Sequence, residues 1–299
     1  MSATTSAEVS RPEAAPTTTR SSRLVAAVTH GPAAVALAIV AVIWLVPTIG
    51  LLVSSFRSAT DNASSGWWTA LTAPAQLTLQ PYRNLLEDST MVDALLNTVL
   101  ITVPASLLVV AVSSLAAYAF AWTRFRGRDV LFLIVVGLLV VPIQVALIPV
   151  ARLYDVLGLF GTIPGVVLFH VAFGLPFAIF LLRNFFVGIP HELLEAARMD
   201  GASEWKVFSG VVLPLGIPAI ASLLIFQFLW VWNDLLVALV FAGGETQPLT
   251  VAIREQLRSF STNIDVIAPA AFVQMVVPLI VFFAFQRYFV QGLLAGSQR

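Results

Sequence analysis

The stretch that decides the fold covers residues 97–122 and reads NTVLITVPASLLVVAVSSLAAYAFAW, with no charged side chain. A helix crosses the roughly 30 Å hydrocarbon core of a bilayer in about 20 apolar residues, because each residue advances it by about 1.5 Å. This stretch is longer than that requirement. It predicts a membrane-spanning helix.

The composition of the whole chain agrees with that prediction. Of 299 residues, 59% are hydrophobic and 11% are charged, whereas soluble domains carry roughly 25% charged residues. The absence of cysteine excludes a disulfide framework and a thiolate metal site, and three scattered histidines argue against a zinc enzyme. A net charge of 0 gives no basic field for nucleic acid. The sequence therefore predicts a multi-span membrane protein that binds no metal, cofactor or nucleic acid.

Five further stretches are long and apolar enough to span a bilayer, which makes six. The six lie at about residues 33–56, 97–122, 130–150 and 162–182, somewhere between residues 211 and 242, and at about residues 267–285. Prolines inside several of them do not exclude spanning, because neighbouring helices can satisfy the carbonyls that a proline leaves free. The runs are continuous rather than alternating, which excludes the strands of a membrane barrel. The predicted fold class is an all-α integral membrane protein with six transmembrane helices.

The distribution of basic residues predicts the orientation. With these spans, eleven Arg and Lys residues fall on one side of the membrane and five on the other. Cytoplasmic loops carry the excess of basic residues. Both termini and the arginine-rich loop at 124–128 are on the richer side, so both termini are predicted to be cytoplasmic.

The first 30 residues differ from the rest of the chain. They are rich in Ser, Thr, Ala and Pro and show no apolar periodicity, which is typical of a disordered segment. They are also too polar for a signal peptide. We therefore expect a disordered cytoplasmic arm over 1–30 and a single transmembrane domain over 31–299.

The loop between the fourth and fifth predicted spans covers residues 189–210 and reads IPHELLEAARMDGASEWKVFSG. Pro190 suits a first helical position, where its missing N–H costs nothing. Glu192 and Glu195 follow in the first turns, next to the positive end of the helix dipole. Gly201 can adopt the left-handed conformation that ends a helix. These signals predict a short helix of about three turns on the cytoplasmic side.

The same loop predicts a second helix and a docking face. Ser203 can cap a short helix that ends near Gly210. On the first helix Leu193, Ala197 and Gly201 share a nearly smooth stripe, against which another protein can pack closely. The alternative is an amphipathic helix lying on the inner leaflet, but such helices are rich in Lys and Arg opposite bulky aromatics. This helix has neither feature, so the pattern favours protein docking.

The loop resembles that of a known family. Glu195-Ala196-Ala197, Asp200-Gly201-Ala202 and Leu213-Pro214 match the EAA loop of bacterial ABC importer permeases. Other motifs are similar to the carbohydrate subgroup, closest to the smaller permease of maltose-type importers: Tyr82-Arg83-Asn84, Asn97-Thr98, Ala116-Ala117-Tyr118-Ala119, Pro142-Ile143-Gln144, Leu175-Pro176-Phe177 and Trp232-Asn233-Asp234. The ending at 286–297 looks especially like that of α-glucoside permeases.

The resemblance implies an architecture and a set of partners. We expect a type I ABC importer permease, multi-pass in the bacterial plasma (inner) membrane. A second permease would complete a heterodimer, and an extracytoplasmic binding protein would deliver the sugar. A cytoplasmic ATPase dimer would use ATP and Mg²⁺. The chain itself would be no enzyme, and it would translocate an oligosaccharide or glycoside by alternating access.

The resemblance also implies which residues contact the ATPase. In the family, the loop helix fits into a groove on the ATPase subunit, where Glu195 would form the polar contact, and Gly201 would permit the turn. The implied coupling residues are Glu192, Leu193, Glu195, Ala196, Ala197, Arg198, Asp200, Gly201 and Ala202. The implied tail contact consists of Gly292, Leu293, Leu294, Ala295, Gly296 and Ser297.

The residues themselves show that ATP must be used by another chain. A phosphate-binding loop needs Gly-x-x-x-x-Gly-Lys-[Ser/Thr], because its lysine reaches the β- and γ-phosphates. The single lysine of this chain, Lys206, lies between Trp205 and Val207. The chain cannot form such a loop.

A few polar residues lie within predicted spans. Asp234 is the only acidic one, and a charge at the bilayer centre costs roughly 2.5–3.5 kcal/mol on insertion scales. Trp230, Asn233 and Asp234 are therefore candidates for lining a sugar pathway. The alternative is that the fifth span begins late, near Ala219, which would place Asp234 close to the outer interface. The sequence favours interhelical hydrogen bonds for four further polar residues: Gln144, His170, Gln227 and Gln274.

Two other classes of function stay open. A secondary transporter driven by protons or sodium would show inverted repeats and broken helices around midplane charges, and only Asp234 fits. A membrane-embedded enzyme would need clustered His, Asp or Glu within spans, and no such cluster is visible in the sequence. The sequence does not decide the sugar; an α-glucoside or a malto-oligosaccharide is the expectation.

Overall fold

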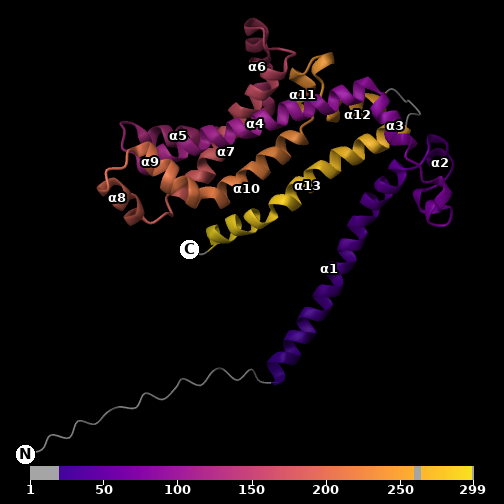
Figure 1. Cartoon of the computed structure of the whole chain (residues 1–299), viewed down its shortest axis with the longest axis horizontal. Coiled ribbons are helices and arrows are strands. Elements are labelled where there is room, and N and C mark those ends of the chain that lie inside the picture. Colours follow the sequence, from indigo (N-terminus) through magenta and orange to yellow (C-terminus); the bar gives the residue numbers. More distant parts are fainter. Residues whose placement is uncertain (1–19, 259–263, 298–299) are drawn as a thin grey trace, which may run out of the picture. The chain divides into compact units, whose positions relative to one another are not determined.

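The apolar stretches fold as helices, as their length and composition predict. The structure, a computed structural model, describes the backbone of residues 20–258 and 264–297 and the side chains of 34–258 and 264–286. Its contacts divide the chain into two units, Met1–Gly50 and Leu51–Arg299. Figure 1 shows helices throughout the second unit, and the described part contains one isolated bridge, between Arg57 and Leu77.

The first unit contains most of helix α1 (Arg20–Ser55), whose segment Ala34–Ser55 could span a membrane. The helix begins inside the segment that the sequence assigns to a disordered arm, so the expectation is corrected for residues 20–30. Leu24 and the alanines at 26 and 27 favour helix and continue the apolar run toward the span. Residues 1–19 lie outside the described part.

Among the described residues, five helical segments can cross a bilayer, or six when a bent pair counts as one span. The first is in α1. The others are α4 (Ser89–Trp122), α7 (Ile163–Phe186), the continuous segment Glu204–Trp232 and α13 (Ile264–Ser297), and the bent pair is α5 (Arg128–Leu138) with α6 (Ile143–Leu157).

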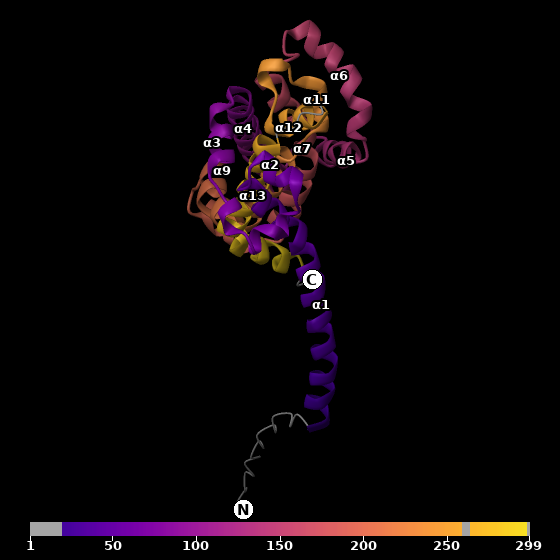
Figure 2. The same ribbon diagram turned by 90° about the vertical axis from the view of Figure 1, so that its right-hand side faces the viewer.

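The third predicted span, 130–150, is not one straight helix. α5 and α6 meet at an angle of 102°, and Figure 2 shows α6 turning away from α5. Pro142 occupies the N-cap of α6. A proline has no N–H to continue a helix and keeps the preceding residue out of the helical region, so the apolar run breaks here.

The fifth span, predicted somewhere between residues 211 and 242, is found there, but its helical segment begins earlier, at Glu204. The second loop helix, α9 (Glu204–Val207), does not end near Gly210 but continues through a π-helical turn (η3, Phe208–Val212) into α10 (Leu213–Trp232). Pro214 would clash with the carbonyl four residues back in an uninterrupted α-helix, and the wider turn lies at that point. The loop helix and the span are therefore one continuous rod.

The core of the second unit lies where α4, α7 and α10 pack together. Ala117, Ala178 and Leu223 are fully buried there. At Gly174 on α7 a Cβ atom would come within 2.7 Å of the Gln227 side chain on α10, so the small residue allows close packing. α13 runs beside α10 (Figure 1), where Gln274 and Trp232 exchange side-chain to backbone hydrogen bonds of 2.8 and 3.0 Å. The expected interhelical role of Gln274 is thus confirmed.

Shorter helices cover the end of the second unit opposite α8 (His191–Met199) and α9, as Figure 1 shows for α3 and α12. They are α2 (Ala59–Ser64), η1 (Trp67–Leu71), η2 (Pro74–Gln76), α3 (Gln80–Glu87), α11 (Leu236–Phe241), η4 (Gly244–Thr246) and α12 (Leu249–Arg258). The segment between α1 and α3 folds around the fully buried Arg57. The guanidinium group donates to Asp61, Asn62, Ser65, Thr69 and Gln76.

Candidate partner-docking site

Helix α8 forms almost where the sequence predicts it. Pro190, predicted at the first helical position, occupies the N-cap, so the helix begins one residue later at His191, and Glu192 lies in the first turn. Gly201 has a φ of +78° and nothing within 4 Å of where a Cβ would be. The predicted left-handed stop is confirmed, and glycine is needed there for its backbone alone, since an L-residue resists this conformation.

One leucine attaches α8 to the body of the protein. Leu194 is completely buried among the core residues of α7, α9 and α10, and Ala197 and Ala202 pack partly against the same cluster. Leu193, by contrast, is 46% exposed. The stripe of Leu193, Ala197 and Gly201 is therefore no single docking face, because its middle residue contacts the chain's own core. The sequence pattern singled out Leu193 and missed Leu194.

The exposed face of α8 carries acidic side chains and, at the last helical residue, a large apolar one. Met199 is 88% exposed, the most of any exposed large apolar side chain among the described residues. Glu195 and His191 form a pair of 3.3 Å one turn apart. We call this surface the outer face of α8; it consists of His191, Glu192, Leu193, Glu195, Ala196, Met199 and Asp200. It contains five of the nine predicted coupling residues, and exposed Gly201 follows it directly.

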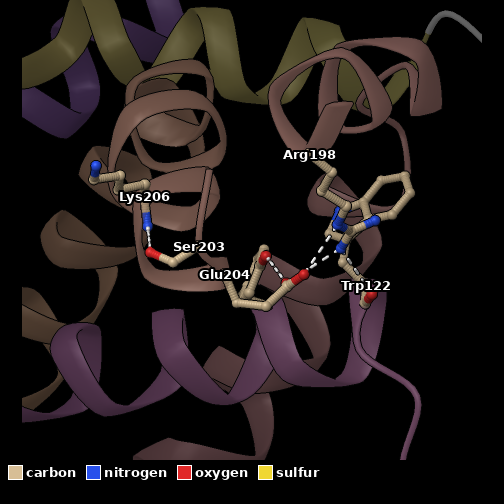
Figure 3. A network of polar contacts seen from close by, with 6 residues as sticks. Trp122, Arg198, Ser203, Glu204 and Lys206 are labelled. Atoms are coloured by element: carbon tan, nitrogen blue, oxygen red, sulfur yellow. Dashed lines mark hydrogen bonds and ion pairs between the residues drawn. The ribbon is translucent and has the colours of Figure 1, made fainter. Parts of the chain in front are cut away.

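Arg198 makes contacts within the chain. Its Nε and Nη2 atoms donate to the two carboxylate oxygens of Glu204 at 2.9 and 3.2 Å, and Nη2 also donates to the Trp122 carbonyl at 3.4 Å (Figure 3). The Tyr118 hydroxyl donates to Oε2 of the same carboxylate at 2.5 Å. We call these four residues the clamp. It ties α8 to α9 and to the last turns of α4.

The local chemistry of the clamp follows from its members. Two parallel N–H···O bonds are the preferred geometry of an arginine with a carboxylate. The hydrogen bonds from Arg198 to Glu204 raise the pKa of the Arg198 guanidinium, so the charge persists at any physiological pH. Ser203 positions Glu204 by capping α9, accepting the Lys206 N–H at 3.4 Å. Arg198, which the sequence predicts at the partner contact, is thus already engaged in an ion pair.

Trp122 joins the ends of two spans to α8. Its indole N–H donates to the Phe186 carbonyl at the end of α7, at 3.1 Å, and its ring lies 5.6 Å from the His191 ring at the start of α8. The last carbonyls of a helix have no partner within the helix, and the Phe186 carbonyl accepts both this indole N–H and the Ile189 N–H. α4, α7 and α8 therefore meet at a single side chain.

A groove of about 990 Å³ lies between α8 and the loop that joins α4 to α5. We call residues 123–127 the basic loop. Arg124 and Arg128 line one side of the groove, Glu195 and Met199 line the other, and Trp122 also contributes. The groove is open to its surroundings, and three clamp residues line one part of it: Trp122, Arg198 and Glu204.

The predicted pathway residues belong to a different place, at the end of α10. The helix ends at Trp232, and the Asp234 carboxylate accepts the N–H groups of Val237 and Ala238 at 3.3 and 3.0 Å, near the start of α11. The buried His170 ring on α7 has Nε2 3.7 Å from this carboxylate. The span thus ends early rather than beginning late, and Asp234 satisfies the backbone of the next helix.

The remaining candidates are distributed as follows. Trp230 is 40% exposed and meets His170 edge-on at 5.6 Å, and Asn233 is exposed and bonds the Leu229 carbonyl at 2.8 Å. The predicted tail contact at 292–297 lies outside the described side chains. Among the described residues, no group of three or more His, Asp or Glu side chains could hold a metal ion.

The known proteins that this chain resembles are membrane components of transport systems. The sequence model of the family described as "Binding-protein-dependent transport system inner membrane component" matches residues 109–294. The chain is 49% identical to the osmoprotective compounds uptake permease protein of Synechocystis sp., covering 89% of this chain and 91% of that protein. It is 46% identical to the alpha-glucoside transport system permease protein of Rhizobium meliloti, over 81% and 67% of the two chains.

The fold has a counterpart among solved structures. A chain of a bacterial ABC transporter involved in the import of the acidic polysaccharide alginate superimposes with a TM-score of 0.75, at 24% identity, over 92% of this chain and 100% of that one. At this identity the likeness shows a shared fold.

Proposed function

Because the chain belongs to the family of binding-protein-dependent transport system inner membrane components, we propose that it is the permease subunit of an ATP-driven sugar importer. The single observation that carries the coupling mechanism is α8. It is a short helix with an exposed outer face, fixed to the body of the protein by Leu194 and by the clamp. A helix held in this way can receive a force from another protein and pass it on.

The work of transport is divided among several chains. The family implies a second permease, a cytoplasmic ATPase and a binding protein that delivers the substrate. The chain catalyses no covalent chemistry; ATP hydrolysis belongs to the ATPase subunit. The basic loop and α8 face the cytoplasm in this proposal, as the excess of arginines on that side predicts.

The mechanism begins at the outer face of α8. Glu192, Glu195 and Met199 contact the ATPase, whose closure on ATP displaces α8. Leu194 transmits the displacement to the core. The clamp transmits it to α4 through Tyr118 and to the fifth span through Glu204, the first residue of the continuous segment Glu204–Trp232. The spans then rock between inward-open and outward-open arrangements, which is a rigid-body form of switching.

An ion-driven secondary transporter is the rival, and the family argues against it. Among the side chains that the structure describes, the pair of His170 and Asp234 is where the rival finds support. The Asp234 carboxylate, however, is engaged by two backbone N–H groups at the start of α11. A proton relay needs a chain of titratable groups, and this pair stands without a third among the described side chains.

The substrate class follows from the relatives. Two relatives with 49% and 46% identity transport osmoprotective compounds and α-glucosides, respectively, by their names. We propose α-glucosides as the substrate class, which also agrees with the sugar importers among more distant relatives. Other osmoprotective compounds are the second candidate, because the Synechocystis relative is matched over nearly its whole length.

Reconstitution tests the function. The chain, its second permease, the ATPase and the binding protein are placed in proteoliposomes, and uptake of labelled α-glucosides is followed with ATP inside. We expect uptake that requires ATP and all subunits. Uptake by this chain alone under an ion gradient would establish the rival. Stimulation of ATP hydrolysis by α-glucosides, β-glucosides and glycine betaine then separates the substrate classes.

A further inference from the structure

The loop side of the groove between the basic loop and α8 has no part in the function described so far. We propose that it is a second contact with the ATPase, and that it accepts an acidic segment of that subunit carrying an apolar side chain. This inference rests on the proposed function, since it assumes that the ATPase covers the outer face of α8. It adds a site on the permease into which the ATPase inserts.

The charges on the loop side of the groove, opposite the Glu195 and His191 pair on α8, favour an acidic occupant. Arg198 and Glu204 neutralise each other at 2.9 Å, and Arg128 is paired with Asp129 at 3.0 Å. Arg124 is exposed and has no ion pair among the side chains that the structure describes. The uncompensated charge on the loop side of the groove is therefore positive. Complementary charges across an interface steer association and fix its register.

The groove also offers apolar surface. Met199 is 88% exposed and lies on the helix side, and Trp122 adds indole surface that is only partly covered. Tryptophan, methionine and arginine are enriched in protein interfaces, and tryptophan and arginine are frequent among residues that dominate binding energy. A groove with all three residue types suits a protein segment better than a small anion.

The occupant is identified by the continuity between the groove and the outer face of α8. Glu195 and Met199 belong both to the outer face of α8 and to the wall of the groove. A protein that covers the outer face therefore extends over the opening of the groove. The basic loop then lies at the edge of the same contact. Anionic lipid is the competing occupant, because arginines near a membrane surface also attract phosphate headgroups.

The basic loop supplies its own matched control. Arg124 lines the groove, whereas Arg126, two residues away, is also exposed and does not line it. Both can be reversed in charge, as Arg124→Glu and Arg126→Glu, in the full importer complex, which is measured in detergent and in vesicles of phosphatidylglycerol or phosphatidylcholine. Retention of the second permease and an unchanged Tm of the complex verify folding. The readout is the apparent Kd of the ATPase subunit for the membrane subunits at increasing salt.

We expect Arg124→Glu to weaken ATPase association by about fivefold or more and to flatten its salt dependence, while Arg126→Glu changes it less than about twofold. Arg124→Gln should give an intermediate loss. The two reversals could instead weaken ATPase association equally, in phosphatidylglycerol vesicles but not in phosphatidylcholine vesicles. That result would show that the groove binds lipid, and it would overturn the proposal.

Failure of the groove proposal can be distinguished from failure of the proposed function. If Glu195→Arg on α8 abolishes ATPase association and Arg124→Glu leaves it unchanged, the groove is not a contact and the function stands. If neither reversal changes association, the ATPase does not dock on this end of the chain, and both proposals are wrong.

Discussion

Two arginines at opposite ends of the second unit both donate to carbonyl and side-chain oxygens, Arg57 through six hydrogen bonds and Arg198 through three, but they join different parts of the chain. Arg57 is fully buried, and all its hydrogen-bond partners lie within 19 residues of it. Arg198 has a side chain that is 32% exposed, and it reaches a carbonyl 76 residues away. The first arginine closes a local segment on itself. The second, through Glu204, connects helices that are distant in the sequence.

The comparison teaches what each kind of contact can do. A buried guanidinium with many neutral acceptors and no paired carboxylate stabilises one conformation of its own segment, because every donor is used there. A partly exposed ion pair contributes little to stability, but it can transmit displacement between the elements that it joins. We therefore expect mutations at Arg57 to change folding and mutations at the clamp to change coupling.

The largest effect is expected at Arg57. In Arg57→Ala several buried acceptors lose their donor at once, which should destabilise residues 57–76 by on the order of 2–4 kcal/mol. Hydrogen exchange of this segment should rise, while exchange in α8 should not change. Arg83→Ala, at an exposed arginine on α3, is the control. If exchange in 57–76 is unaffected, then Arg57 does not organise the segment.

A mutation in the clamp should change coupling rather than folding. Glu204→Arg removes the bonds to Arg198 and Tyr118, and we expect sugar uptake per ATP hydrolysed to fall by about tenfold, the size of a typical coupling free energy. Protein level should change little, because the ion pair is half exposed.

The double variant Arg198→Glu with Glu204→Arg restores opposite charges and should recover part of the coupling. A clamp that only stabilises α8 would instead show reduced Tm in the single variant, with uptake per ATP unchanged.

Two glycines near the clamp allow a further test, in which the expected change in stability is smaller. Gly201 and Gly210 both have open space where a Cβ atom would lie, but only Gly201 has a positive φ. Gly201→Ala should cost about 1 kcal/mol and loosen the end of α8, because an L-residue is strained there. Gly210→Ala should be neutral or slightly stabilising, since it lies in helical backbone.

Thermal unfolding of the complex and uptake per ATP, measured on both glycine variants, check this difference. Equal behaviour of the two variants would show that the turn at Gly201 has no part in coupling.

Much of the fold is local and could be predicted. The run at 97–122 spans in α4, and the capping residues around α8 and α9 act where the sequence places them, at Gly201 and Ser203. The bend at Pro142 and the π turn before Pro214 were not predicted, although each proline was visible. A proline indicates that a helix can break but not whether the packing around it will turn the chain.

Which face of each helix packs inward could not be predicted. In a soluble protein the apolar face is the buried one, but a bilayer is as apolar as the core. Leu100 and Leu107 on α4 are exposed, whereas Ala105 and Ser106 are buried. On α8, outside the spans, the two adjacent leucines 193 and 194 left open which of them is buried. No pattern signals that Tyr118 will meet Glu204, 86 residues away.

The sequence by itself determined that this chain spans a membrane, where its helices lie, and that a short capped helix precedes the fifth span. These properties depend on residues within one or two turns of each other, and capping, proline and apolar length act at that range. The tertiary structure decided the bend in the third span, the anchoring of α8 by Leu194, the clamp and the capping role of Asp234 beside His170. Each of these depends on which helices pack together. The sequence does not indicate that packing, because an apolar side chain can face either lipid or the protein core.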